Sequence, residues 1–332
     1  MTNKVIVTGG AGFIGHHLVS ALAADGNVVY LVDDLTANVI DVENYFTEKN
    51  VSVRSVLPQM LQHYDRSNDP RKPSIIFVNS DFSNVSILEL VRNENIDTVY
   101  HLAAKPRVEW SVENPVESTG ENFTKALLLA KACAEGKTRL IFSSTAAVYG
   151  DVENLPTTES SNKNPQSPYG LAKLCAEKYF DLFENLYGLD WAALRYFNVY
   201  GPAQPGDSPY STVVSAWCHK AIKNEPLRSD GDGEQTRDMV YVDDVVSANI
   251  CVASAETLST RIFNVGSSKA VSNNYIRSLF EKRGYDKVKN APARRGDVRH
   301  TLADTANLRA LGWKPNVDFD VGMEKVFKYW EL

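Results

Sequence analysis

The stretch that decides the fold is "KVIVTGGAGFIGHHLVSALAADG", residues 4–26. It begins with a β-branched run typical of a buried strand and ends with apolar residues at helical spacing. Between them, the glycines of "TGGAGFIG" let the backbone turn sharply and approach a pyrophosphate, and the next helix N-terminus offers unpaired N–H groups. "NVVYLVDD", residues 27–34, is a second strand pattern ending in two acids. This order predicts a doubly wound parallel α/β sheet.

Two acids at strand ends indicate which dinucleotide the turn would bind. Asp33 closes the second strand, where a carboxylate accepts hydrogen bonds from adenosine ribose hydroxyls and repels a 2′-phosphate. The sequence therefore favours NAD over NADP. Asp81 ends the later strand "SIIFVNSD" and has two open interpretations. It either contacts adenine, with Phe82 alongside, or is an ordinary turn acid.

Strand and helix patterns alternate through most of the chain. Further strands are predicted in "SIIFVNSD", "DTVYHLAA", "RLIFSS" and "DWAALRYF", and helices over 85–93, 115–136 and 167–187. Residues 36–74 are polar and punctuated by proline, so we expect an excursion from the sheet, partly helical at most. Prolines and glycines cluster after Gly201, and we place the main boundary near Asn198. The predicted domains are 1–197 with returns to the sheet near 239–265, and a discontinuous smaller lobe of 198–238 and 266–332.

Composition excludes several classes of protein. The 332 residues carry a net charge of −6, which argues against bulk binding to nucleic acid or an anionic membrane. No apolar run approaches the roughly 20 residues that span a bilayer. The strand pattern begins within four residues of the N-terminus, so no signal peptide is expected. The four cysteines are widely spaced and form no CxxC, so we expect neither a zinc site nor disulfides, and a cytoplasmic location.

A catalytic pair is predicted in "SPYGLAK". Tyr169 and Lys173 are four residues apart and share one face of a helix. A free tyrosine titrates near 10, too high for a base at neutral pH, but a nearby ammonium and an oxidised nicotinamide favour the phenolate. Thr145 ends the preceding strand, where its hydroxyl either orients the same substrate oxygen or caps backbone.

These motifs together resemble the extended short-chain dehydrogenase/reductase family, and specifically its nucleotide-sugar 4-epimerases. The resemblance rests on "TGGAGFIG", "VDDL", "HLAAK", "SSTAAVYG", "SPYGLAK", "RYFNVYGP", "GDGEQTRDMVYVDDVV" and "RRGDVRHTLAD". It covers nearly the whole chain and weakens over 36–74. It also departs at "ENFTKALLL", where the family's Asn-x-x-Gly-Thr is Asn122-x-x-Lys125-Ala126. The resemblance implies a Rossmann-type fold with a smaller C-terminal substrate-binding lobe.

The resemblance also implies roles for individual residues. Tyr169 is similar to the family's acid and base, Lys173 to the partner that also touches nicotinamide ribose, and Thr145 to the substrate-orienting hydroxyl. The implied cofactor contacts, besides Tyr169 and Lys173, are Gly9, Gly12, Phe13, Ile14, Gly15, Asp33, Asp34, Asp81, Phe82, Leu102, Ala103, Ala104, Lys105, Asn122, Ser143 and Tyr196. The implied UDP-sugar contacts, besides Thr145 and Tyr169, are Lys105, Asn198, Arg237, Arg294, Asp297 and Thr301.

Two alanines bear on the reaction type. The related 4,6-dehydratases and decarboxylases place an acid after the threonine or one residue further on, where this chain has Ala146 and Ala147. Elimination needs that additional acid and base, so the alanines favour reversible oxidation at C4. The resemblance implies that Tyr169 takes the C4 hydroxyl proton while tightly bound NAD takes the hydride. The 4-keto sugar then turns about its pyrophosphate link and is reduced on its opposite face.

Substrate choice and partners are implied by the resemblance alone. Thr301 stands where a bulky tyrosine restricts the family's pocket to simple hexoses, so its small side chain favours UDP-GlcNAc and UDP-GalNAc, alongside UDP-Glc and UDP-Gal. The helices at 115–136 and 167–187 are surfaces that this family pairs in homodimers. The alternatives are another nucleotide-sugar oxidoreductase, a uronate 4-epimerase, or a non-catalytic NAD-binding regulator. The intact Thr–Tyr–Lys set argues against the regulator.

Overall fold

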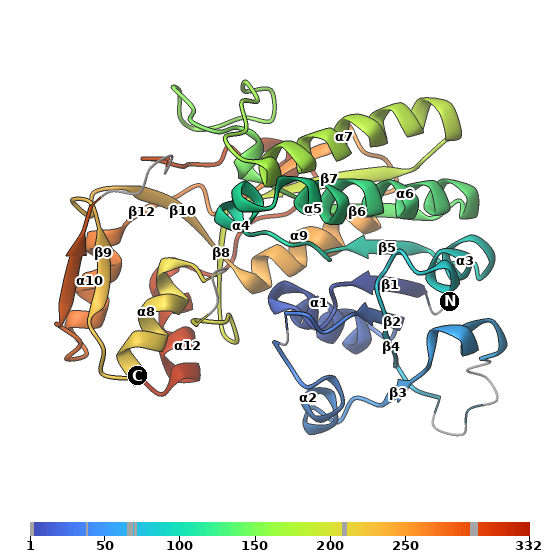
Figure 1. Cartoon of the computed structure of the whole chain (residues 1–332), viewed down its shortest axis with the longest axis horizontal. Coiled ribbons are helices and arrows are strands. Elements are labelled where there is room, and N and C mark those ends of the chain that lie inside the picture. Colours follow the sequence, from blue (N-terminus) through green and yellow to red (C-terminus); the bar gives the residue numbers. More distant parts are fainter. Residues whose placement is uncertain (1–2, 38, 65–68, 70–71, 208–210, 293–297) are drawn as a thin grey trace.

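A parallel sheet forms the centre of the protein in the computed structural model, which describes residues 3–37, 39–64, 69, 72–207, 211–292 and 298–332. Within these residues, eight strands lie in the order β11-β7-β6-β5-β1-β2-β4-β3 and pair in parallel throughout (Figure 1). They are β1 (Lys4–Thr8), β2 (Val28–Asp33), β3 (Val53–Ser55), β4 (Ile75–Asn79), β5 (Thr98–His101), β6 (Arg139–Thr145), β7 (Trp191–Tyr196) and β11 (Ile262–Val265). The predicted doubly wound α/β fold is confirmed.

Helices bury both faces of this sheet. Along β1, Val5 and Val7 belong to one hydrophobic core, and Ile6 between them belongs to the other, because successive strand residues face opposite sides. The first core includes residues of α1 (Phe13–Ala24) and α9 (Val242–Ser254). The second includes residues of α3 (Val85–Asn93), α6 (Lys125–Gly136) and α7 (Pro168–Tyr187). Burial on both faces explains why these strands read as continuous apolar runs.

The long predicted helices are present, with one interruption. α3 spans the predicted residues, and α7 begins as expected, with the Ser167 side chain accepting from the Gly170 N–H and Pro168 at its first position. The predicted helix at 115–136 is built from α5 (Pro115–Thr119), the π-helical turn η3 (Gly120–Thr124) and α6. Such π turns widen a helix locally and recur at functional sites.

The prediction that residues 36–74 leave the sheet is wrong in one part. Of the described residues, α2 (Val42–Glu48) and the 3-10 helix η1 (Pro58–His63) lie outside it, but β3 pairs in parallel with β4 at its edge. Three residues are too short for a strand pattern to emerge from the polar sequence around them. The polar side chains of β3 fit its position at the edge of the sheet, where only one side of the strand is covered by a neighbouring strand.

The described residues of the smaller lobe form two short sheets. One has the order β12-β10-β8, from β8 (Asn198–Tyr200), β10 (Thr236–Tyr241) and β12 (Ala270–Ser272); the other pairs β9 (Leu227–Asp230) with β13 (Val288–Ala291). Its helices are α8 (Val213–Ile222), α10 (Asn273–Glu281), α11 (Ala306–Ala310) and α12 (Phe319–Trp330). Within the expected return near 239–265, β10 joins β8, α9 packs against the large sheet and β11 joins that sheet.

Packing ties the smaller lobe to the large sheet. Tyr200, Trp217 and Phe280 belong to the same hydrophobic core as Val5 and Leu31. The division of the chain into 1–197 and the later segments stays a prediction. In the part of the chain that the structure describes, no helix combines the length and apolar character needed to cross a membrane.

Candidate active site

A cavity of about 500 Å³ opens where the carboxyl ends of the strands meet. The chain runs from β1 to β2 and β4 on one side, and to β5, β6 and β7 on the other, so the order reverses between β1 and β5. Ligands bind doubly wound sheets at such a switch point. The predicted cofactor residues that line the cavity are Gly9, Gly12, Phe13, Ile14, Gly15, Asp33, Asp34, Asp81, Phe82, Leu102, Ala103, Ala104, Lys105, Ser143, Tyr169 and Tyr196.

The glycine turn after β1 is closed so tightly that side chains would not fit. Gly9 has a φ of +69°, and a Cβ atom there would lie 2.7 Å from the backbone N of Ala103. A Cβ atom on Gly15 would lie 2.0 Å from the carbonyl oxygen of Gly9. Among the described residues no side chain caps the N-terminus of α1, so its N–H groups are available at the cavity wall. This cradle fits the pyrophosphate of a dinucleotide.

Asp33 is held at the end of β2 with its carboxylate at the cavity. Its oxygens accept from the N–H of Ala11 at 2.9 Å and of Leu35 at 2.8 Å. Burial raises the pKa of Asp33, and these two hydrogen bonds oppose that rise. The neighbouring Asp34 is exposed and accepts from the N–H and hydroxyl of Thr36. Asp33 thus links the glycine turn to the loop after β2, while Asp34 caps that loop.

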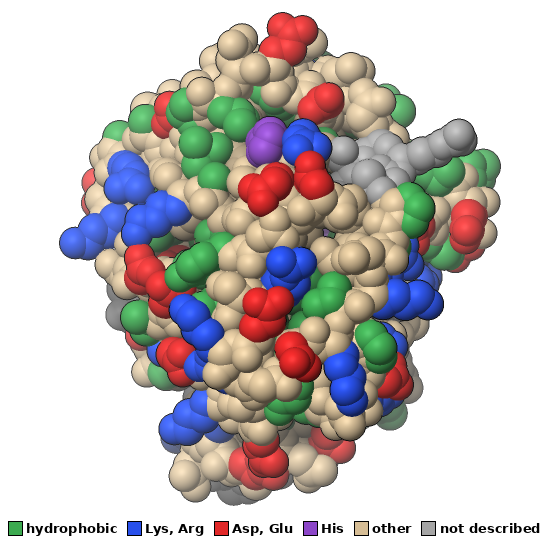
Figure 2. All heavy atoms as spheres, turned by 90° about the vertical axis from the view of Figure 1, so that its left-hand side faces the viewer, with side chains coloured by type: hydrophobic (Ala, Val, Ile, Leu, Met, Phe, Trp, Pro, Cys, Tyr) green, Lys and Arg blue, Asp and Glu red, His purple; other side chains and the backbone are tan. Residues whose placement is uncertain are grey.

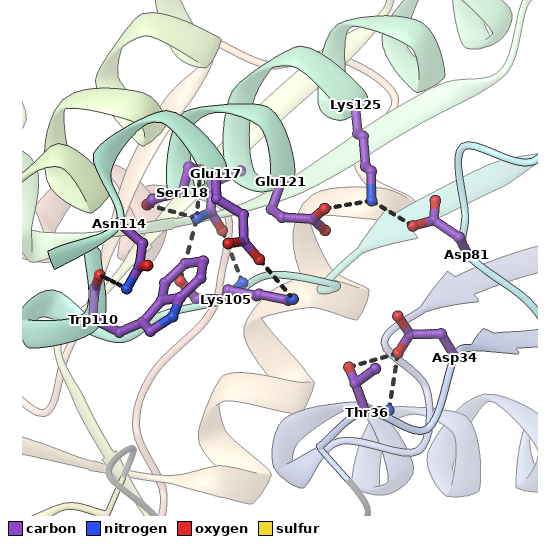
Figure 3. A network of polar contacts seen from close by, with 11 residues as sticks. Asp34, Thr36, Asp81, Lys105, Trp110, Asn114, Glu117, Ser118, Glu121 and Lys125 are labelled. Atoms are coloured by element: carbon purple, nitrogen blue, oxygen red, sulfur yellow. Dashed lines mark hydrogen bonds and ion pairs between the residues drawn. The ribbon is translucent and has the colours of Figure 1, made fainter. Parts of the chain in front are cut away.

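Asn122 of the π-helical turn lies behind the cavity rather than in its lining. Its side-chain oxygen accepts from the Lys105 N–H at 2.9 Å, and its amide donates to the carbonyls of Lys105 and Ser118. The side chain is therefore occupied by the loop after β5, which carries Ala104 and Lys105 into the cavity wall. Lys105 in turn lies 3.8 Å from Glu117 and above the ring of Trp110 (Figure 3).

The predicted catalytic residues lie together at the end of β6 and the start of α7. The Thr145 hydroxyl accepts from the Ala147 N–H at 3.1 Å, which leaves its own proton to donate to the Tyr169 hydroxyl. Lys173 is buried and donates to the Ser143 carbonyl at 2.9 Å. Gly170 allows this approach, because a Cβ atom there would lie 2.8 Å from the Ala147 carbonyl oxygen. Tyr169 lines the cavity, and Thr145 and Lys173 stand behind it.

Burial is the main cause of the shifted pKa values of Tyr169 and Lys173. It raises the pKa of Tyr169 to about 12, and the hydrogen bond from Thr145 opposes the rise. It lowers the pKa of Lys173 to about 7, against the attraction of Glu177. The sequence-based expectation that the ammonium makes Tyr169 acidic is therefore outweighed by desolvation. For the predicted base role of Tyr169, positive charge from an oxidised cofactor would have to supply the further stabilisation of the phenolate.

A buried ion pair fixes α7 to the sheet beneath the catalytic trio. Arg195 of β7 donates to both carboxylate oxygens of Glu177, at 3.0 and 2.6 Å, and both side chains are 3% exposed. Glu177 also accepts from the Ser144 hydroxyl at 2.5 Å, and Arg195 donates to the Tyr149 hydroxyl at 2.8 Å. Glu177 lies one helical turn beyond Lys173, so the pair fixes the part of α7 that carries Tyr169 and Lys173.

Three of the predicted substrate residues, Asn198, Arg237 and Thr301, lie on or against the small sheet and outside the cavity lining, whereas Lys105 and Tyr169 line the cavity. Asn198 of β8 pairs with Met239 of β10, and Arg237 donates to the carbonyls of Thr236 and Arg299. The Thr301 hydroxyl accepts from the Asp238 N–H at 3.0 Å, so this side chain also joins residues 299–301 to β10. Arg294 and Asp297 lie outside the described residues.

Several cavity residues escaped sequence reasoning. Arg107 and Trp110 line the cavity just after the β5 loop, and Gln204 lines it from the loop after β8. An arginine and a tryptophan soon after a strand's carboxyl end are a usable signal, because exposed aromatic and basic side chains there often contact ligands. Gln204 offered no such signal, since its position depends on hydrogen bonds to Val199 and Thr212.

Comparison with known proteins extends over the whole chain. Residues 5–266 match the model of the NAD dependent epimerase/dehydratase family. A putative UDP-glucose 4-epimerase of Methanocaldococcus jannaschii is 33% identical over 98% of this chain and 97% of its own. The structure of a UDP-N-acetylglucosamine 4-epimerase from Methanobrevibacter ruminantium M1, in complex with UDP-N-acetylmuramic acid, is 34% identical. It has a TM-score of 0.86 and covers 100% of this chain and 99% of its own.

The cofactor is also shared with a solved structure. A UDP-glucose 4-epimerase of Thermus thermophilus, in complex with NAD, is 30% identical, with a TM-score of 0.80 and 99% of both chains covered. The glycine cradle and Asp33 described above fit the same dinucleotide. The chain therefore belongs to the NAD dependent epimerase/dehydratase family, among its nucleotide-sugar 4-epimerases.

Proposed function

We propose that this enzyme interconverts UDP-N-acetylglucosamine and UDP-N-acetylgalactosamine, and accepts UDP-glucose and UDP-galactose as well. The observation that carries the proposal is the arrangement of Thr145, Tyr169 and Lys173 at the cavity, with two alanines beside them. The Thr145 hydroxyl donates to Tyr169, and Lys173 lies behind on the same helix face. Such a set moves one proton to or from a substrate hydroxyl.

The chemistry of the chain's own residues follows from this geometry. Tyr169 takes the proton of the sugar C4 hydroxyl and returns it when the ketone is reduced. Thr145 is held by the Ala147 N–H, so its hydroxyl keeps a fixed direction toward the shared oxygen. Buried Lys173 lies one helical turn beyond Tyr169, where its protonated form favours the Tyr169 phenolate. NAD, when bound, supplies the hydride acceptor and donor and carries a positive charge when oxidised.

Ala146 and Ala147 favour epimerisation over elimination. They form the 3-10 turn η4 (Ala146–Val148), directly after Thr145, and neither side chain can hold or donate a proton. Loss of water from C5–C6 needs an acid or base in addition to Tyr169. The catalytic trio supports oxidation and reduction at C4, and the turn beside it supplies no group for elimination.

The smaller lobe is proposed to hold the nucleotide and to set sugar choice. Asn198, Arg237, Arg294 and Asp297 are the proposed contacts to the uridine diphosphate, and Arg is suited to phosphate oxygens. Thr301 is proposed to leave room for an N-acetyl group. Binding energy from the remote diphosphate would retain the reactive ketone between the two half-reactions.

The defining experiment supplies UDP-N-acetylglucosamine to the purified chain without added NAD. We expect the C4 epimer to accumulate to equilibrium without release of a keto sugar, because the cofactor is regenerated in each cycle. Nuclear magnetic resonance of the reaction mixture resolves the two epimers. UDP-glucose and UDP-glucuronate serve as parallel substrates. Turnover of the glucuronate alone would support the uronate epimerase, and a released keto product would support an oxidoreductase.

We further propose a homodimer formed through α4 (Val108–Glu113), α5, α6 and α7. Exposed hydrophobic side chains concentrate on these helices: Val108, Val112, Val116, Leu128, Leu171, Tyr179, Leu182, Leu186 and Tyr187. Val116 is 86% exposed and Leu171 is 52% exposed. By contrast, the outer face of the smaller lobe mixes charged side chains of both signs with scattered hydrophobic ones (Figure 2). A second copy would bury the apolar helix surface.

The dimer is tested by analytical ultracentrifugation. We expect the wild-type chain to sediment as a dimer at micromolar concentration and the variant V116E/L171E as a monomer, because two buried carboxylates without partners oppose association. Val321→Glu is the matched control: Val321 lies on α12, away from these helices, and is 54% exposed. A monomeric wild type, or a dimeric double variant, would contradict the proposed interface.

A further inference from the structure

Lys125, one of the two residues that depart from the resembled family, lies behind the cavity wall. Its ammonium is 2.6 Å from a carboxylate oxygen of Asp81 and 2.6 Å from one of Glu121 (Figure 3). Both acids line the cavity. Asp81 is 44 positions away in the sequence, after β4, so the contact joins two elements that only the fold brings together.

Three hydrogen bonds fix the Asp81 carboxylate. One oxygen accepts from the Ser83 N–H at 2.7 Å and the Ser83 hydroxyl at 2.6 Å, and the other accepts from Lys125. Partial burial alone would raise the pKa of Asp81, but these bonds hold it below its usual value. A carboxylate offers about four acceptor positions, so one is left for a donor in the cavity. Without Lys125, one of its two oxygens would lose its partner.

We propose that Lys125 is a positioning residue for the cofactor: it holds the Asp81 carboxylate in place to accept a hydrogen bond from the exocyclic amine of adenine. This inference rests on the proposed contact of Asp81 with the adenine end of NAD. Lys125 also offsets two carboxylates of a wall that carries Asp33, Asp34, Asp81, Glu117 and Glu121. The wall also carries Lys105 and Arg107, and loss of Lys125 would make its net charge more negative and less favourable to the diphosphate of the incoming dinucleotide.

A purely structural role for Lys125 makes a different prediction. If the ammonium only tied η3 and α6 to the loop after β4, its removal would lower stability but affect all dinucleotides equally. A positioning role instead affects recognition of one base edge. The informative pair of ligands is NAD and nicotinamide hypoxanthine dinucleotide, in which a carbonyl oxygen replaces the exocyclic amine. A fixed carboxylate accepts from the amine and repels the carbonyl.

The experiment measures the dissociation constants of both dinucleotides by calorimetry on the chain freed of nucleotide. We expect the wild type to bind NAD about tenfold more tightly than the hypoxanthine analogue. Lys125→Met keeps the aliphatic stem and should narrow this preference to within about threefold, mainly by weakening NAD. Lys125→Arg should retain most of the preference. Lys131→Ala is the matched control, because Lys131 pairs with Glu135 on the same helix.

The outcomes separate this inference from the proposed function. A Lys125→Met variant that melts at the wild-type temperature and keeps the full preference overturns the positioning role. A wild type that binds both dinucleotides equally overturns the adenine contact, and the positioning role with it. Neither result affects the epimerase proposal, which fails if the wild type forms no C4 epimer of UDP-N-acetylglucosamine, releases a keto sugar or turns over UDP-glucuronate alone. Two further variants, Asp81→Asn alone and Asp81→Asn combined with Lys125→Met, complete a double-mutant cycle. If these two variants show the same preference for NAD over the hypoxanthine analogue, the result supports the inference that Lys125 acts through Asp81.

Discussion

Replacing Tyr169 with phenylalanine is expected to lower the turnover of UDP-N-acetylglucosamine by about 10²- to 10⁴-fold, the range that general acid–base catalysis contributes. The substitution removes the oxygen that accepts the Thr145 proton and leaves the rest of the buried ring in place. Binding of NAD should change by less than about threefold, because the glycine cradle and Asp33 are untouched. Epimer formation is followed by chromatography, and cofactor binding by calorimetry.

Tyr179→Phe is the matched control for this prediction. Tyr179 lies on the same helix α7 but is 43% exposed, so its hydroxyl is expected to contribute nothing to turnover. Tyr169→Phe with wild-type turnover would remove Tyr169 from its role as acid and base. A variant that loses NAD affinity in proportion to its turnover would instead assign Tyr169 to cofactor binding. A wild-type chain that binds NAD but converts no UDP-sugar would instead support the NAD-binding regulator.

Replacing Arg195 with methionine is expected to lower the free energy of unfolding by roughly 3–5 kcal/mol. The reason is the carboxylate of Glu177, which would stay buried without its two guanidinium hydrogen bonds. The Ser144 hydroxyl would be its remaining neighbour from the network. Urea denaturation followed by circular dichroism gives the difference between the two chains. Turnover should fall too, because the pair fixes the helix that carries Tyr169 and Lys173.

Two comparisons make the stability prediction specific. Glu135→Gln breaks the exposed contacts of Glu135 with Arg92 and Lys131, and should cost less than about 1 kcal/mol. Combining Arg195→Met with Glu177→Gln should cost clearly less than the sum of the single variants, since the second change removes the unpaired charge. Strictly additive effects, or a cost for Arg195→Met no larger than the surface control, would contradict a coupled buried pair.

Local sequence patterns predicted much of the fold and many of the residues that line the cavity. The β-branched runs of β1 and β2, the glycines between β1 and α1, and the Ser167–Pro168 start of α7 each depend on neighbours in the chain. Their physical causes are backbone conformation, capping and periodic burial, which short stretches express by themselves. The cavity at the switch point contains most of the cofactor residues that these patterns and the family resemblance together implied.

Elements that depend on distant partners could not be predicted in this way. The edge strand β3 is recognisable only through its pairing with β4. The sheet to which β10 belongs is decided only by its pairing with β8, which keeps it out of the large sheet. The π-helical turn η3 reads as uninterrupted helix, although it carries Asn122, whose side chain holds the loop after β5. A sequence pattern gives the spacing of buried residues, but it does not say which distant strand or loop packs against them.

The sequence by itself determined the fold class, the dinucleotide turn and the identity of the Thr145, Tyr169 and Lys173 trio. Only the tertiary structure decided the electrostatics of the site. Burial, rather than the neighbouring ammonium, governs the pKa of Tyr169, and Lys125 reaches Asp81 across 44 positions of sequence. The physical reason is range: hydrogen-bond capacity and helical spacing are local properties, whereas desolvation and charge pairing depend on every chain segment that surrounds a group.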